Sequence, residues 1–320
     1  MNSLELSIVI PCFNTHESLV ELIERIDNSL PKTNFEVILV DDGSIDDTWT
    51  VIEALSKNND KVEGIKLSRN FGQHKAIRAG LEKSKGLNIV VMDCDLQDRP
   101  EDIPELLCKI QNSEAEIVLT LKKSREHSNF KNFTAAIYRT VFNSLINSNI
   151  EKITKEVGGF SICSRKVIDS YLKINDAHGH YLNFIIWIGF NKTFIEVEHE
   201  RRKYGESNYN LRKLIIHAID GITSESDKLL KISLLIGLFF TTVTFASMII
   251  ILYKKLTSGF LPGWTSILLA SLISITINLV SFGILGAYIG KIFEQVKQRP
   301  HYIVEKDTQE KERAWKKKSA

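Results

Sequence analysis

The sequence has few features of a secreted, zinc-binding or nucleic-acid-binding protein. Its four cysteines form no Cys-x-x-Cys pair and are widely dispersed, at Cys12, Cys94, Cys108 and Cys163. This spacing predicts neither a zinc site nor a disulfide framework, and it favours a reduced, cytosolic setting. Neither sign of charge dominates, because 41 Lys and Arg residues are balanced by 39 Asp and Glu residues. A nucleic-acid-binding protein would be strongly basic, so we expect no nucleic acid partner.

Two common nucleotide-binding motifs are also missing. The first strand-like run continues into IPCFNTHES, where a dinucleotide-binding enzyme would carry Gly-x-Gly-x-x-Gly. No Gly-x-x-x-x-Gly-Lys-Ser/Thr stretch occurs anywhere in the chain. These absences argue against a dehydrogenase and against a P-loop enzyme. A nucleotide can still bind through a metal ion, because paired carboxylates hold Mg²⁺ or Mn²⁺, which in turn neutralises a diphosphate.

Strand-like and helical patterns alternate over the first 120 residues. The strand-like runs are apolar and short, at 6–11, 35–42, 62–68, 88–93 and 115–120. The segments between them place apolar residues three and four positions apart, which is typical of amphipathic helices. Such alternation predicts an α/β domain with a mostly parallel sheet that is covered on both faces.

Acidic residues follow two of these predicted strands. The stretch VVMDCDLQD ends one strand with Asp93 and Asp95, and Asp41 and Asp42 end another. Taken alone, such acids are either solvated turn residues or a cation site. Ligands of open parallel sheets gather at the carboxyl ends of the strands, so we expect both acidic groups to face the same edge. That shared position favours the cation site.

Two long apolar runs lie near the C-terminus. Residues 229–253 and 264–290 each span about 25 positions, against the ~20 needed to cross a bilayer. Buried helices of a large soluble core would be the alternative. The short linker 254–263 predicts a transmembrane hairpin, and the excess of Lys and Arg at its outer ends predicts cytosolic termini. The stretch at the N-terminus predicts no signal peptide, since it has no basic region followed by a long apolar one.

Several motifs together resemble a known enzyme family. SIVIPCFNTHESL, VILVDDGSIDDT, LSRNFGQHKAIRAGLEKSKG and VVMDCDLQDRPEDIPEL resemble, in order and spacing, family 2 glycosyltransferases with the Rossmann-like GT-A fold. AAIYRTVFN, SRKVIDSYL and RRKYGESNYNLRKLIIHAIDGI, with the hairpin, resemble the branch that contains bactoprenol glucosyltransferases and dolichol-phosphate mannose synthases. The resemblance implies inverting transfer of a sugar from a nucleoside diphosphate sugar to a polyprenyl phosphate, with Mg²⁺ or Mn²⁺ as cofactor.

The resemblance also implies roles for individual residues on the donor side. Residues expected to bind the nucleotide sugar are Pro11, Asp41, Asp42, Asp93 and Gln97. Asp95 is the expected direct metal ligand, and Asp93 is expected to reach the ribose or the metal. Asp98 continues the motif at the sugar end. The expected catalytic residues are Asp93, Asp95, Asp98 and Arg202.

On the acceptor side, Arg202, Ser207 and Tyr209 match the Arg-x-x-Gly-x-Ser-x-Tyr element that would close over the diphosphate and the acceptor. Lys122, Arg125 and Arg139 are candidates for contact with the acceptor phosphate and anionic lipid, although a solvated basic face is the ordinary reading of such charges. The chain departs from the family pattern at Gly159, where many members carry an aspartate. Either that acid is dispensable or the donor sugar differs from glucose and mannose.

The expected organisation has four parts. Residues 1–210 form the cytosolic catalytic domain, 211–228 a juxtamembrane amphipathic helix, 229–290 two transmembrane helices and 291–320 a basic cytosolic tail. We expect this tail to be loosely ordered from about Val304. The resemblance implies a bacterial inner-membrane protein and is compatible with a tetramer, which the sequence itself does not show. Two alternatives remain open: a family 2 transferase with another acceptor, and a membrane scaffold with a degenerate catalytic domain.

Overall fold

The computed structural model describes residues 4–122, 157–176, 179–198, 228–258 and 263–309. These divide into two compact units. The first holds the described residues up to 198 together with 300–309, and the second holds 228–258 and 263–299. The sheet and the candidate site belong to the first unit.

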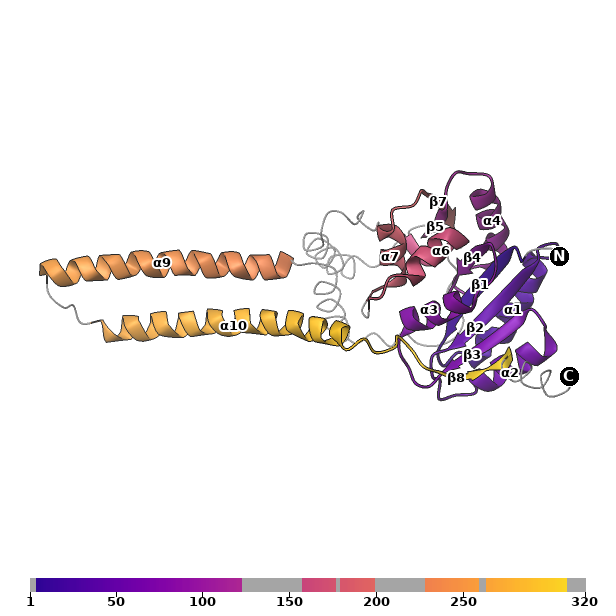
Figure 1. The fold of residues 1–320 in the computed structure, drawn as a ribbon, viewed down its shortest axis with the longest axis horizontal. Coiled ribbons are helices and arrows are strands. Elements are labelled where there is room, and N and C mark those ends of the chain that lie inside the picture. Colours follow the sequence, from indigo (N-terminus) through magenta and orange to yellow (C-terminus); the bar gives the residue numbers. More distant parts are fainter. Residues whose placement is uncertain (1–3, 123–156, 177–178, 199–227, 259–262, 310–320) are drawn as a thin grey trace. The chain divides into compact units, whose positions relative to one another are not determined.

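An eight-stranded sheet in the order β7-β5-β6-β4-β1-β2-β3-β8 forms the centre of the first unit (Figure 1). The strands are β1 (Leu6–Cys12), β2 (Phe35–Asp41), β3 (Val62–Leu67), β4 (Asn88–Val91), β5 (Ile117–Lys122), β6 (Val157–Ser164), β7 (Lys192–Val197) and β8 (Val304–Asp307). β1 pairs in parallel with both β2 and β4, and β2 pairs in parallel with β3. The five predicted strands are therefore confirmed, with β1 in the middle.

Helices cover both faces of the sheet, as the alternating pattern predicts. They are α1 (His16–Ser29), α2 (Thr48–Asn58), α3 (Gln73–Lys83), the short 3-10 helix η1 (Pro100–Asp102), α4 (Ile103–Gln111), α6 (Arg165–Leu172) and α7 (Tyr181–Trp187). Alternate residues of β1 join different cores: Ile8 packs with residues of α1 and α4, and Val9 with residues of α3 and α6. Both are fully buried. Burial on both faces explains why β1 is almost continuously apolar.

The sheet departs from the predicted parallel arrangement at two strands, β6 and β8. β6 lies between β4 and β5 and is antiparallel to both, and β8 pairs antiparallel with β3. The sheet is therefore mixed, with the parallel arrangement retained for β1 to β4 and for β5 with β7. The expectation of a loosely ordered tail is wrong for Val304–Asp307, because this segment completes the edge of the sheet beside β3.

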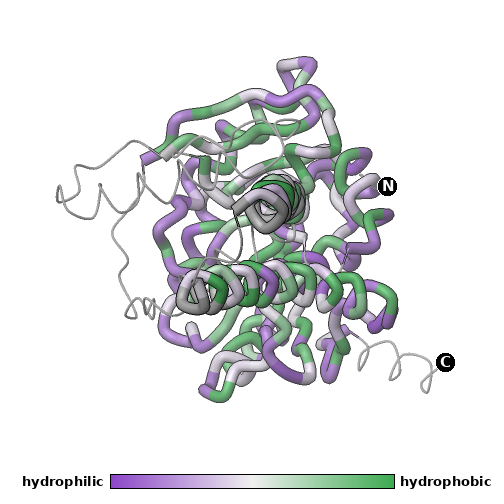
Figure 2. Tube along the Cα trace, turned by 90° about the vertical axis from the view of Figure 1, so that its left-hand side faces the viewer, coloured by the Kyte–Doolittle hydropathy of each residue, from purple (hydrophilic) through white to green (hydrophobic). Residues whose placement is uncertain are grey.

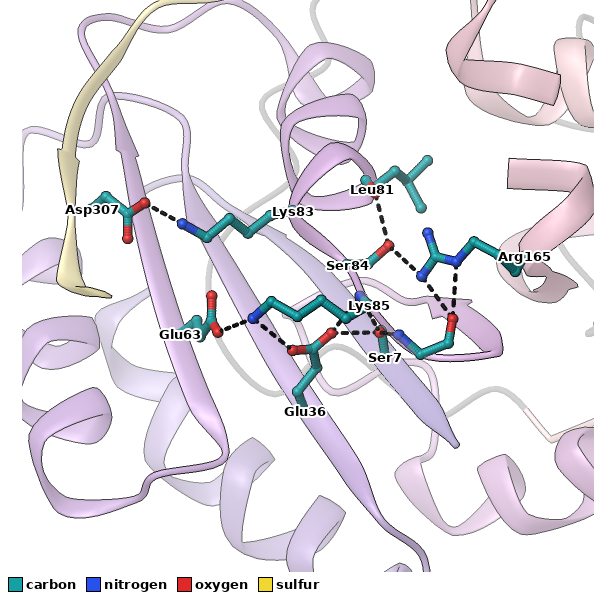
Figure 3. Close-up of polar contacts among 10 residues, drawn as sticks. Ser7, Glu36, Glu63, Leu81, Lys83, Ser84, Lys85, Arg165 and Asp307 are labelled. Atoms are coloured by element: carbon teal, nitrogen blue, oxygen red, sulfur yellow. Dashed lines mark hydrogen bonds and ion pairs between the residues drawn. The ribbon is translucent and has the colours of Figure 1, made fainter. Parts of the chain in front are cut away.

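A polar network secures the amino-terminal edge of the sheet (Figure 3). Nζ of Lys85 lies 2.8 Å from Oε1 of Glu63 and 3.5 Å from Oε2 of Glu36, and these two carboxylates begin neighbouring strands. The hydroxyl of Ser7 donates to Glu36 over 2.7 Å. Arg165 donates to the carbonyl of Gly86 from both Nε and Nη2. Three strand starts and α6 are thus held together at the edge opposite the acidic residues.

The second unit consists of two long helices that contact one another, α9 (Lys228–Ser258) and α10 (Trp264–Val296). Both helices are rich in hydrophobic residues, which Figure 2 colours green. Within the described residues, only Ile273–Val296 of α10 forms a helix long and apolar enough to cross a bilayer, and a shorter apolar stretch covers Gly237–Ser247 of α9. One spanning helix is supported by length and composition, and the hairpin stays a prediction.

Candidate active site

The predicted acidic groups lie at one edge of the sheet. β2 and β4 flank β1 in parallel, so their carboxyl ends point the same way. Asp41 is the last residue of β2, and Asp93 follows the end of β4 by two residues. The edge predicted for ligand binding therefore carries both groups.

Asp42 holds the loop that leads into α3. Its two carboxylate oxygens accept the backbone N–H groups of Phe71 and Gly72, at 2.7 and 2.9 Å. Gly72 has a φ of +101°, which favours glycine at this position. Burial raises the pKa of Asp42 above its ordinary range, although the two amides act in the opposite direction. Asp42 is only 3% exposed, and its carboxylate stabilises the conformation of this loop.

Gln73, the first residue of α3, contacts the Asp-x-Asp motif directly. Its Nε2 donates to Oδ1 of Asp93 over 2.7 Å. The connection from β3 to α3 therefore touches both acidic groups, through its amides at Asp42 and through Gln73 at Asp93. Sequence reasoning missed Gln73, even though it lies inside the motif LSRNFGQHKA, because an amide side chain carries no periodic signal.

The turn that carries Asp93 and Asp95 is fixed by hydrogen bonds within the turn and by one from α1. Oδ2 of Asp98 accepts the N–H of Asp93 over 3.3 Å, and Oδ1 of Asp95 accepts the N–H of Gln97 over 3.1 Å. The hydroxyl of Ser18 in α1 donates to the carbonyl of Cys94 over 2.7 Å. Leu96 is held at a φ of +61°. An apolar residue in this left-handed region is strained, which is common in backbone at functional sites.

Exposure separates the candidate residues into two groups. Asp93, Asp95 and Gln97 are each partly exposed. Pro11, Asp41, Asp42 and Asp98 are buried. The three partly exposed side chains can contact a ligand without a rearrangement of the protein. The buried group shapes the surrounding turns; Oδ1 of Asp41, for example, accepts the N–H of Ser44.

The candidates for the acceptor side fall mostly outside the described residues. This applies to Arg125, Arg139, Arg202, Ser207 and Tyr209. Lys122 is the last residue of β5, where its backbone pairs with Val197 of β7.

Gly159 lies on β6 close to the Asp-x-Asp turn. β6 runs antiparallel to β4 with Ser161 opposite Val91, and extending this register by two positions sets Gly159 opposite Asp93. Gly159 is exposed, and a Cβ atom added to it would meet no other atom within 4 Å among the described residues. A side chain at this position would therefore fit without displacing its neighbours.

Two histidines form a hydrogen-bonded pair beside this strand. The backbone N–H of Tyr181 donates to Nδ1 of His74, so Nε2 of His74 carries the hydrogen and donates to Nδ1 of His180 over 2.6 Å. Burial, together with the charge of His180, lowers the pKa of His74 to about 4. The hydroxyl of Tyr181 also lies 3.2 Å from that of Ser161, which joins the pair to β6.

The exposed carboxylates suit a divalent metal ion. Mg²⁺ and Mn²⁺ prefer oxygen ligands, and Mg²⁺ is commonly held by one or two carboxylates with phosphate oxygens of the substrate. Within the part of the chain that the structure describes, no three His, Cys, Asp or Glu side chains gather closely enough to hold an ion by themselves. Asp93 and Asp95 fit a site that the substrate completes.

Comparison with known proteins agrees with this geometry. Residues 7–172 match the family described as glycosyl transferase family 2. The chain belongs to this family. It is 34% identical to the uncharacterized glycosyltransferase YkcC of Bacillus subtilis (strain 168), over 95% of this chain and 94% of that protein. It is 31% identical to the bactoprenol glucosyl transferase of Shigella phage SfII, over 95% of this chain and 98% of that protein.

Solved structures support the fold of this family 2 glycosyltransferase. The chain superposes with a TM-score of 0.51 on glucosyl-3-phosphoglycerate synthase from Mycobacterium tuberculosis in complex with Mn²⁺, UDP and phosphoglyceric acid. The match covers 69% of this chain and 76% of that one, at 16% identity. The predicted family and its α/β GT-A fold are therefore confirmed.

Proposed function

We propose that this glycosyltransferase moves a sugar from a nucleoside diphosphate sugar to a polyprenyl phosphate of the undecaprenyl type. The choice of a polyprenyl phosphate as acceptor is supported by the similarity to bactoprenol glucosyl transferase over nearly the whole of both chains. The partly exposed carboxylates of Asp93 and Asp95 support a diphosphate donor. The product is a lipid-linked monosaccharide for cell-envelope polysaccharide.

The reaction is a displacement at the anomeric carbon, with inversion. An oxygen of the acceptor phosphate forms the new bond to this carbon, and the bond from the carbon to the donor diphosphate breaks. A phosphate monoester has a second pKa near about 6, so the acceptor is largely dianionic at neutral pH. The nucleophile therefore needs no strong general base, and the missing acid at Gly159 does not prevent the reaction.

The main task of the protein is to stabilise the charge that develops on the leaving diphosphate. Asp95 and Asp93 would hold Mg²⁺ or Mn²⁺, which supplies positive charge to the diphosphate oxygens. Gln73 fixes the rotamer of Asp93 by its hydrogen bond, and Asp98 fixes the turn by accepting the N–H of Asp93. Arg202 would add a second positive charge at the diphosphate.

The acceptor implies a membrane location. Ile273–Val296 is long and apolar enough to cross a bilayer. We propose that α9 crosses as well, so that the protein is a multi-pass protein of the bacterial inner membrane with both termini and the catalytic unit in the cytosol. Lys122, Arg125 and Arg139 would meet the acceptor phosphate and anionic lipid, and Arg202, Ser207 and Tyr209 would close over the substrates.

Two other candidates keep some support. A family 2 transferase with another acceptor is compatible with the same donor side. A catalytically degenerate scaffold is supported only by Gly159, whereas Asp93 and Asp95 keep the exposure that a metal site needs. We propose that the donor sugar is an amino or deoxy sugar and differs from glucose and mannose. The reason is that the carboxylate expected near the sugar is absent at Gly159.

Sugar transfer from radiolabelled nucleotide sugars to undecaprenyl phosphate in detergent tests the proposal. Wild type with Mn²⁺ should give a lipid-linked product from at least one donor, and EDTA or Asp95→Ala should abolish it. Ser170→Ala is the matched control and should retain activity. It removes an exposed hydrogen bond within α6, from the hydroxyl of Ser170 to the carbonyl of Lys166. Product in EDTA would refute metal dependence, and no product from any donor would favour the scaffold.

A further inference from the structure

The segment that follows α10 returns to the catalytic unit and makes a series of specific contacts there. We define residues 301–309 as the C-terminal segment; it contains β8. Seven residues separate the end of α10 from the start of β8. The segment is rich in charge, so apolar burial alone does not explain why it pairs with β3.

The C-terminal segment binds β3 through backbone and side-chain hydrogen bonds. Lys306 pairs with Lys66 in the antiparallel ladder. Oγ1 of Thr308 accepts the N–H of Gly64 in β3 and the hydroxyl hydrogen of Ser56 in α2, both over 3.0 Å. The methyl group of Thr308 also lies where a Cβ on Gly64 would meet it at 3.1 Å, so the C-terminal segment is closely packed against β3.

The same segment also binds the end of α3. Asp307 forms an ion pair with Lys83, the last residue of α3 (Figure 3). The hydroxyl of Tyr302 donates to Glu82 in the same helical turn. The C-terminal segment therefore holds both elements that flank one connection of the chain, the loop from β3 to α3.

We define residues 68–72, which make this connection, as the donor-side loop. The N–H of Ser68 donates to the carbonyl of Ile303 in the C-terminal segment over 2.9 Å. At its other end, the loop supplies the two amides that bind Asp42. The next residue, Gln73, binds Asp93. One loop thus joins the C-terminal segment to the Asp-x-Asp motif.

The donor-side loop has little freedom to shift independently. Arg69 passes so close to Gly43 that a Cβ on this glycine would lie 2.3 Å from the backbone carbon of Arg69. Gly43 has a φ of +69° and directly follows Asp42. The loop is therefore packed between the Asp42–Gly43 turn on one side and the C-terminal segment on the other.

We propose that the C-terminal segment is a positioning element for donor binding, which sets the donor-side loop and, through Gln73, the carboxylate of Asp93. Tyr302, Asp307 and Thr308 are its positioning residues. This inference rests on the proposed function, since it concerns the donor of that same reaction.

The test compares the full-length triple variant Tyr302→Phe/Asp307→Asn/Thr308→Val with wild type in detergent. Each replacement keeps the shape of the side chain; Tyr302→Phe and Thr308→Val remove the hydroxyl, and Asp307→Asn removes the negative charge of the ion pair. The probes are UDP, GDP and TDP with Mn²⁺, measured by calorimetry. We expect the Kd of the preferred diphosphate to rise about five- to tenfold, as for the loss of one or two hydrogen bonds. The donor KM should rise with it, while the acceptor KM stays unchanged.

Hydrogen exchange gives a second readout that does not depend on nucleotide. The amides of Phe71 and Gly72, which bind Asp42 in the wild type, should exchange faster in the triple variant. The matched control is Lys166→Gln/Ser170→Ala. It removes the ion pair of Lys166 with Glu116 and the hydrogen bond that the hydroxyl of Ser170 donates within α6. It should leave both the Kd and exchange in the donor-side loop unchanged.

The possible results separate the two proposals. A wild type that binds no diphosphate overturns the proposed function, and this inference with it. A wild type that binds, with a triple variant of equal Kd and equal loop exchange, overturns this inference alone. A lower melting temperature with an unchanged Kd also overturns it, because the C-terminal segment would then only stabilise the fold.

Discussion

Lys85 is the residue whose replacement tests the fold most directly. Its Nζ lies between Glu63 and Glu36, whose side chains are only 4% and 9% exposed. Lys85→Met removes the cation that contacts both carboxylates but keeps most of the aliphatic chain. Burial lowers the pKa of Lys85, but the hydrogen bond and charge of Glu63 outweigh it and raise the pKa overall. The stabilisation is therefore fully present at pH 7 and is lost only as the pH rises through this raised pKa.

The expected cost follows from the burial of the three side chains. Removing one partner of a fully buried pair costs about 3–5 kcal/mol, because the other charge stays buried alone. The side chain of Lys85 is 48% exposed, so solvent screens the interaction. We therefore expect a loss of about 2 kcal/mol in the free energy of unfolding. For a unit of this size, that loss lowers the melting temperature by about 4–8 °C.

Thermal unfolding in detergent measures this loss. The exposed ion pair between Lys166 and Glu116 provides the control, and Lys166→Met should cost no more than about 1 kcal/mol. Lys85→Met/Glu63→Gln should regain part of the lost stability, since it removes one of the uncompensated charges. Activity per folded molecule should stay unchanged, because the network lies at the edge opposite Asp93. Equal melting temperatures for Lys85→Met and Lys166→Met would refute the reasoning.

Three further predictions concern single residues. The pKa of His74 is lowered to about 4 in the folded protein, so this histidine takes up a proton at a higher pH in the unfolded chain than in the folded one. The folded state therefore loses stability as the pH falls from ~6.5 to about 4, by up to about 3 kcal/mol. Denaturation at pH 7 and 4.5 should show a smaller loss for His74→Gln than for wild type; equal losses would contradict the shift. Gly159→Asp should fold normally, since a Cβ there meets no described atom, and should change the donor profile in the transfer assay; an unchanged profile would argue against a sugar contact. Only one of the four cysteines in the native protein, Cys108, is exposed and should react rapidly with a thiol reagent, as peptide mass spectrometry would show; rapid modification of Cys94 would contradict its burial.

Local patterns were sufficient to predict the first half of the catalytic unit. β1 to β5 and their helices follow from short apolar runs and from three- and four-residue spacing, because each element buries a face that its own sequence defines. The position of Asp93 and Asp95 was predictable for the same reason. A parallel strand that is buried on both faces ends where charged residues begin.

Other features depended on pairing between distant segments. β6 lies between β4 and β5 although it follows both in the chain, and nothing in the stretch Val157–Ser164 specifies which neighbours it has. β8 is four mostly charged residues without an apolar face. It is a strand because β3 offers an edge for pairing, because Thr308 accepts the N–H of Gly64 in β3, and because Asp307 forms an ion pair with Lys83 of α3.

The division between sequence and structure is clearest at the active site. The amino-acid sequence was sufficient to predict the family, a mostly parallel sheet and the acidic pair, since these depend on local composition and motif spacing. The order of the strands, the exposure of Asp93 and Asp95 and the burial of Asp42 and Asp98 depend on tertiary packing and became known only from the fold. The tertiary structure also placed Gln73 against Asp93 and the C-terminal segment against the donor-side loop, because hydrogen bonds between residues far apart in the chain leave no periodic signal in the sequence.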